Sequence, residues 1–171
     1  MILQKQPNQW SCVVTSAAMI LEIPVEQLID DIGHDGSEIL FPHLTDHLSR
    51  RSFHPQEISV AALKYGWACS LMEIWPAFYD TKLNKNFKIG DSLHAKHLFY
   101  IIAHEHACIL FGELKNDNGS HAVACDNGII YDPVGNICNL ENYPMEFEMF
   151  MPFFKIDKVE LENYAPYLSR A

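Results

Sequence analysis

Three residues that lie far apart in the chain have side chains that could act together as a nucleophile, a base and an orienting acid. Cys12 opens an apolar segment, and His121 and Asp132 stand at opposite ends of a later short segment. A carboxylate beside a histidine fixes the tautomer of the ring and stabilises the imidazolium. A cysteine at a helix N-terminus gains thiolate character, because the helix dipole favours negative charge there. If the three side chains meet, the cysteine sulfur could attack a carbonyl carbon with the histidine as base. The alternative interpretation is that Cys12 is a buried core residue and His121 a surface residue, without a shared function.

The sequence "HAVACDNGIIYDP" predicts a β-hairpin that would bring His121 and Asp132 to one face. With Asn127–Gly128 as the loop, Val123 pairs with Asp132 and His121 lies diagonally across on the same face. With Asp126–Asn127 as the loop, His121 pairs directly with Asp132. A three-residue loop would send the two side chains to opposite faces unless a bulge intervenes. The pairing is therefore a geometric test of the hypothesis.

Helical segments come first along the chain and strands come later. Apolar spacing and stop signals at Pro24, Gly33 and Gly66 predict helices early in the chain, and a further helix before the strands. The expected helices are 12–22, 25–33, 55–66 and 93–105, and the expected strands are 67–75 and 107–114, followed by the hairpin. The aromatic and acidic tail 143–171 has no clear pattern. This order predicts one α+β domain spanning residues 1–171.

Composition narrows the class of protein. The chain has 171 residues, 49% of them hydrophobic and 20% charged, which is typical of a globular domain. Its 12 basic and 22 acidic residues give a net charge of −10, which argues against a nucleic-acid partner. We see no membrane-spanning run and no signal peptide. Five widely spaced cysteines, an odd number, argue against a disulfide framework and favour a cytoplasmic protein. Oligomeric state stays open.

Other candidates have weaker patterns. The cysteines Cys69, Cys108 and Cys125 have apolar neighbours, which is typical of core residues. In "HEHAC", His104, His106 and Cys108 would share one face of a strand and could bind a metal, but the preceding residues read as a helix. We therefore predict no metal and no cofactor. Trp10 could line a substrate groove or cover the core, and Gln4 and Gln9 read as polar surface residues.

The two blocks around Cys12 and His121 resemble a known superfamily. A glutamine six positions before a cysteine that opens an apolar helix, here Gln6 and Cys12, resembles the papain-like cysteine peptidases. The run "TSAAMIL" and the later "GSHAVACDNGIIYDP" resemble more narrowly the bacteriocin-processing (double-glycine leader) peptidases in their stand-alone form. The resemblance implies a papain-like fold, in which N-terminal helices pack on an antiparallel sheet.

The resemblance also implies a role for each matched position. Gln6 falls on the oxyanion-hole glutamine, Cys12 on the nucleophile, His121 on the general base and Asp132 on the orienting acid. Two departures stand out: Val13-Val14 replaces the family's Gly-Pro, and His121 precedes Asp132 by only 11 positions. The implied function is a cysteine peptidase that cleaves a peptide or amide bond of a peptide or protein substrate. An acyltransferase using the same triad and an inactive papain-like binding or inhibitory module are the alternatives.

Overall fold

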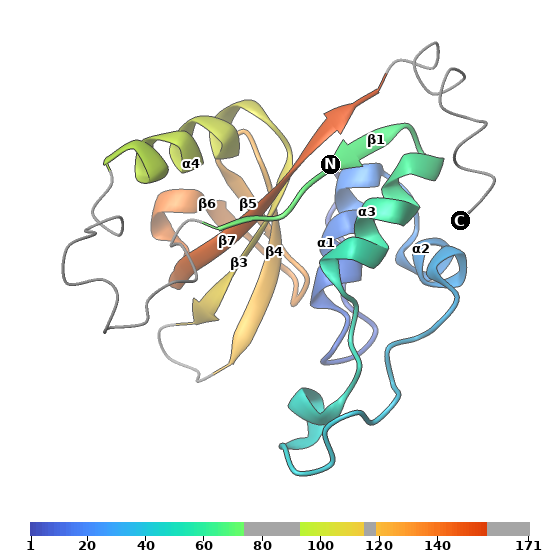
Figure 1. Cartoon of the computed structure of the whole chain (residues 1–171). Coiled ribbons are helices and arrows are strands. Elements are labelled where there is room, and N and C mark those ends of the chain that lie inside the picture. Colours follow the sequence, from blue (N-terminus) through green and yellow to red (C-terminus); the bar gives the residue numbers. More distant parts are fainter. Residues whose placement is uncertain (74–92, 115–118, 157–171) are drawn as a thin grey trace, which may run out of the picture.

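The computed structural model describes residues 1–73, 93–114 and 119–156, which form helices packed on both faces of an antiparallel sheet (Figure 1). The helices are α1 (Cys12–Leu21), α2 (Val25–Ile32), α3 (Pro55–Lys64) and α4 (Leu93–Glu105). The strands are β1 (Trp67–Cys69), β2 (Met72–Glu73), β3 (Cys108–Leu114), β4 (Ser120–Asp126), β5 (Ile129–Asp132), β6 (Asn136–Asn139) and β7 (Met145–Lys155). The expected α+β class, with N-terminal helices packed on an antiparallel sheet, is confirmed.

The strand order is β1-β7-β3-β4-β5-β6, and β2 also pairs with β7. The long strand β7 comes from the segment that the sequence pattern left unplaced, and it joins β1 to β3. The expected strand 67–75 is interrupted, because β1 and β2 are separate strands; residues 74–75 lie outside the described residues. The expected strand 107–114 and the four expected helices are present, with ends shifted by at most two residues.

Two hydrophobic cores lie on opposite faces of the sheet, and α1 and α4 cover one face each (Figure 1). Along β3, Ile109 and Phe111 belong to the core beneath α1–α3, whereas Cys108 and Leu110 belong to the core beneath α4. This alternation is the period of two that a strand imposes on its side chains. Because both faces are covered, β3 reads in sequence as a continuous apolar run.

Helix α1 is the central helix, and nine of its ten residues are buried. Small side chains in its middle, Ser16, Ala17 and Ala18, are fully buried and let the helix lie close to β4. The Ser16 hydroxyl donates to the Ala122 carbonyl oxygen at 3.2 Å. This bond joins the helix that begins at Cys12 to the strand position next to His121.

The hairpin of β4 and β5 has the first of the two predicted registers. Asp126 pairs with Ile129, so the loop is Asn127–Gly128. Both loop residues have positive φ, 51° and 73°, as a tight hairpin turn of this kind requires. The continued register places Asp132 opposite Val123 and diagonal to His121, on one face of the sheet.

All five cysteines are free thiols, and Cys108 and Cys125 are buried core residues as expected. Cys69, for which the same was expected, packs against the core but is only partly buried. Among the helices in the described ranges, none is by itself long and apolar enough to cross a membrane. The pair α1 and α2 reaches that length and composition together, with a bend of 112° between them.

Candidate active site

Cys12 is the first residue of α1, where the helix presents backbone N–H groups that lack intrahelical partners. Ser11, the residue before it, makes no capping bond to these groups, because its hydroxyl donates to the Asn8 side-chain oxygen at 2.5 Å. The first turn of α1 also contains no acidic residue. The N-terminal end of this helix is therefore open to a negative charge, either a thiolate or a developing oxyanion.

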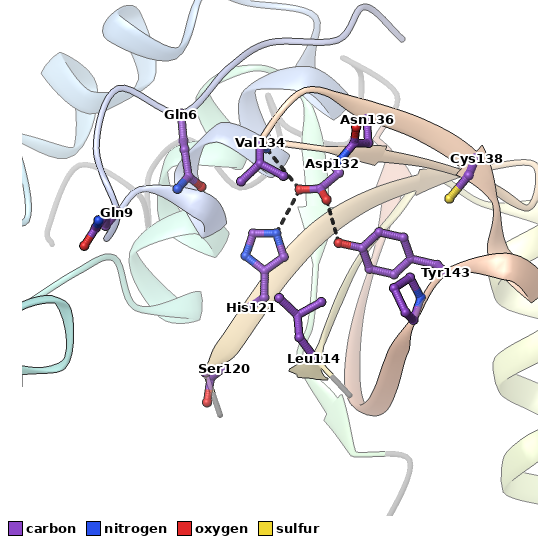
Figure 2. A pocket seen from close by; sticks show the side chains of 12 residues that line it. Gln6, Gln9, Leu114, Ser120, His121, Asp132, Val134, Asn136, Cys138 and Tyr143 are labelled. Carbon is purple, nitrogen blue, oxygen red and sulfur yellow. Dashed lines mark hydrogen bonds and ion pairs between the residues drawn. The ribbon is translucent and has the colours of Figure 1, made fainter. Parts of the chain in front are cut away.

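His121 and Asp132 form a buried ion pair (Figure 2). His121 Nε2 lies 2.9 Å from Asp132 Oδ1, and the two side chains are 10% and 4% exposed. Nε2 is taken by the carboxylate, and the Cys12 thiol is near enough to the ring to help raise its pKa; Cys12 and His121 line the same cavity. The predicted proximity of Cys12, His121 and Asp132 is thus present in the structure.

The environment of His121 favours the protonated ring. Burial alone would lower the pKa of His121, but hydrogen bonds and charge from Asp132 and Cys12 outweigh it and raise the pKa to about 9. At neutral pH the ring is therefore mainly an imidazolium. An imidazolium beside a thiol stabilises the thiolate and holds a proton ready for transfer.

Three donors hold the Asp132 carboxylate. Oδ1 accepts from the Val134 backbone N–H at 3.0 Å as well as from His121, and Oδ2 accepts from the Tyr143 hydroxyl at 2.7 Å. Burial raises the pKa of Asp132, but these bonds outweigh burial and leave the pKa below its ordinary value. The carboxylate therefore stays charged and orients the His121 ring. Tyr143 has no sequence signal, because it precedes a strand that the pattern did not reveal.

Replacing Tyr143 with phenylalanine should destabilise the fold through Asp132. The substitution removes a hydrogen bond to a buried carboxylate, which is typically worth about 1.5–3 kcal/mol. We expect the free energy of unfolding at pH 7 to fall by roughly that amount, and the pKa of Asp132 to rise. Chemical denaturation measured from pH 3 to 7 checks both effects. Tyr100→Phe, at an exposed position of α4, is the control; equal stability of Y143F and wild type would contradict this role.

The three glutamines near Cys12 have different environments. Gln4 is structural, because its side chain donates to the Ile23 carbonyl oxygen at 2.7 Å and accepts from the Val25 N–H at 2.9 Å; the expectation of a plain surface residue was wrong. Gln9 is exposed, as expected, at the rim of the site. Gln6 is fixed by its backbone N–H, which donates to the Pro133 carbonyl oxygen at 2.9 Å.

The Gln6 carboxamide lies at the site itself. Figure 2 shows it directed toward His121 and Asp132. Its Oε1 is buried and has no hydrogen-bond partner among the described residues. Unlike Gln4, Gln6 therefore does not use this oxygen in a structural bond, and its side chain is available to a ligand.

Two cavities meet at His121. The larger, about 640 Å³, contains Gln6 and Asp132 in its wall, and the smaller, about 260 Å³, contains Cys12 and Trp10. Trp10 is held there by its indole N–H, which donates to the Asp35 carbonyl oxygen at 3.0 Å. Trp10 lines the smaller cavity and also packs against the core. Both places expected for it from the sequence are therefore occupied by the one side chain.

The two residues that follow Cys12, Val13 and Val14, have different environments. Val14 is fully buried in the core beneath α1, and Val13 lines the smaller cavity beside Cys12. The metal alternative loses its basis, because His104 lies in the last turn of α4, whereas Cys108 begins β3. These residues do not share a strand face. The His104 ring instead lies against Gly128, where a Cβ would collide with it.

Comparisons with known proteins add a single fold match. No protein-family model and no curated protein matches the chain. Among solved structures, the chain is similar to a double-glycine motif protease from an AMS/PCAT transporter, crystallised in complex with the leader peptide. The match has a TM-score of 0.49 and 17% sequence identity, and it covers 90% of this chain and 91% of that chain. Similarity at this level carries no argument about function, which rests on the site.

Proposed function

We propose that this chain is a cysteine peptidase that cleaves a peptide or amide bond with Cys12 as nucleophile, His121 as acid and base, and Asp132 as the orienting acid. One observation carries the proposal: a buried imidazole is bonded to a carboxylate through Nε2 and lies in one cavity with a thiol at a helix N-terminus. The sequence resemblance to the double-glycine leader peptidases supports the same class of reaction.

The reaction follows from the protonation states. The Cys12 thiolate attacks the carbonyl carbon, and the carbonyl oxygen becomes an oxyanion. When the C–N bond breaks, His121 gives its proton to the leaving nitrogen, and the acyl group stays on sulfur. His121, now neutral, takes a proton from water as the water attacks the thioester. The acid is released, and the thiolate–imidazolium pair is restored. An amine in place of water would make the same site a transferase.

Gln6 is proposed to donate its side-chain amide to the oxyanion, together with the Cys12 backbone N–H. Two observations support this role: the carboxamide faces His121, and the backbone of Gln6 is fixed to Pro133 beside the orienting acid. Donors placed where charge develops stabilise the transition state more than the ground state.

Replacing Gln6 with alanine is expected to lower kcat by about 100- to 1000-fold, as loss of one oxyanion donor does. The rate at which Cys12 is alkylated should stay unchanged, because alkylation develops no oxyanion. Hydrolysis of the 4-nitrophenyl ester of N-acetylglycine and iodoacetamide labelling measure the two rates. Gln56→Ala on α3, at an exposed position, is the matched control. Equal kcat in Q6A and wild type would exclude Gln6 from the oxyanion hole.

A further inference from the structure

The two cavities divide the catalytic residues between them. Cys12 lines only the smaller cavity, Gln6 and Asp132 line only the larger, and His121 lies at the boundary, in both. The sulfur therefore faces only the smaller cavity, whereas the proton donor faces both. A substrate that spans both cavities would pass over His121.

The chemistry assigns a direction to such a substrate. The acyl group stays bonded to the Cys12 sulfur after the first step, so it occupies the cavity that contains Cys12. The leaving nitrogen must lie within hydrogen-bond reach of His121 to receive its proton. The residues that follow the scissile bond are attached to that nitrogen and continue into the cavity on the far side of His121.

The wall of the larger cavity is mostly apolar and uncharged. Its apolar members come from four separate segments: Leu114, Val134, Cys138, Tyr143 and Pro144. Figure 2 shows the first four of them around His121 and Asp132. Apart from the catalytic residues, its polar members are neutral, and no Lys or Arg is among the described residues that line it. Its one carboxylate, Asp132, already accepts bonds from three donors.

We propose that this cavity is a leaving-group subsite that selects a large, uncharged, apolar side chain on the residue immediately after the scissile bond. The inference rests on the proposed function. An apolar side chain gains by leaving water for this wall. In the acyl-enzyme His121 is neutral, so a carboxylate side chain would lose hydration beside Asp132 with no cation among the described lining residues to compensate. The leaving group is then a peptide segment rather than ammonia, which makes the substrate a peptide or protein.

Aminolysis of the acyl-enzyme tests the subsite without a known substrate, because an attacking amine occupies the place of the leaving amine. The acyl donor is the 4-nitrophenyl ester of N-acetylglycine, whose acyl group is small. The competing acceptors are leucinamide, glycinamide and aspartic acid α-amide, and the N-acetylglycyl-amide products are quantified by mass spectrometry. We expect leucinamide to be preferred over glycinamide about fivefold or more, because its side chain is buried, and the aspartic acid amide to be no better than glycinamide.

Variants that fill the larger cavity test whether the preference for leucinamide arises there. Cys138→Phe fills the cavity from β6 and should bring the leucinamide-to-glycinamide ratio close to one. Ile137→Phe is the matched control, because Ile137 directly precedes Cys138 in β6, is 56% exposed and does not line the cavity. Val134→Trp, at a position 55% exposed, repeats the test from the opposite wall if C138F does not fold.

The outcomes separate the inference from the proposed function. A wild-type ratio near one, with 4-nitrophenol release that still requires Cys12, would overturn the subsite and leave the peptidase proposal standing. A preference that survives both cavity-filling variants, or that I137F also removes, would overturn the location. Nitrophenol release that is equal in wild type and Cys12→Ala would overturn the peptidase proposal and the subsite with it.

Discussion

Replacing Cys12 with alanine is expected to lower the rate of ester and peptide hydrolysis by about 10⁴-fold or more, as removal of a nucleophile does in comparable triads. The reason is chemical, since alanine cannot form the thioester on which the mechanism depends. The fold should survive, because alanine is the best helix former and Cys12 is only half-buried at the start of α1. Release of 4-nitrophenol and the melting temperature measure the two properties.

The control for this prediction is Cys69→Ala, which makes the same change at a half-buried thiol of β1. Its hydrolysis rate should match that of the wild type. Mass spectrometry of wild type trapped with the ester should show one acyl group, on Cys12, and C12A should show none. If C12A keeps more than a tenth of the wild-type rate, the nucleophile lies elsewhere.

The second large effect is expected at Asp132. Alanine there removes the bond that orients His121 and the charge that raises its pKa, so hydrolysis should fall by about 10³- to 10⁴-fold. Asparagine should retain more activity than alanine, because its carbonyl oxygen can accept the same bond from Nε2–H. Rates for both variants across pH 6 to 10 are the measurement.

The pH dependence of hydrolysis should show how Asp132 changes the pKa of His121. In wild type the imidazolium loses its proton as pH rises through about 9, so hydrolysis should decline there. In D132N the carboxylate charge is gone, the pKa of His121 is lower, and the decline should begin at lower pH. The raised pKa also stabilises the fold: that contribution is complete below about pH 6.5 and is lost as pH rises through about 9. An alkaline decline at the same pH in D132N and wild type would exclude the ion pair as the cause.

Local sequence signals were sufficient to predict that His121 and Asp132 lie on one face. The loop residues Asn127–Gly128 favour one tight turn, and the period of two along each strand then places His121 and Asp132 on one face. Likewise, apolar spacing and the stop signal at Pro24 predicted the helix that begins at Cys12. The hairpin register and the four helices were confirmed in this way, whereas the expected strand 67–75 is interrupted after Cys69.

Long-range determinants could not be predicted in the same way. β7 is stabilised by pairing with β1 and β3, far away in sequence, so its own pattern was ambiguous. Tyr143 reaches Asp132 only because that strand folds back beside β3. Gln4 was misread because its partners, Ile23 and Val25, lie across the turn between α1 and α2. The two cavities arise where these elements meet, and no single segment encodes them.

The measurement that tests the central claim most directly is the rate of Cys12 alkylation by iodoacetamide from pH 5 to 9, with the labelled residue mapped by mass spectrometry. For wild type we predict labelling that is fastest at Cys12 and stays fast at pH 6, where an ordinary thiol, with a pKa of about 8.5, is almost entirely protonated. In His121→Ala, labelling of Cys12 should fall about tenfold per pH unit below pH 8, as for an ordinary thiol. A Cys12 that reacts no faster than the other cysteines, with the same pH dependence in both proteins, would contradict the thiolate–imidazolium pair and the proposed peptidase function with it.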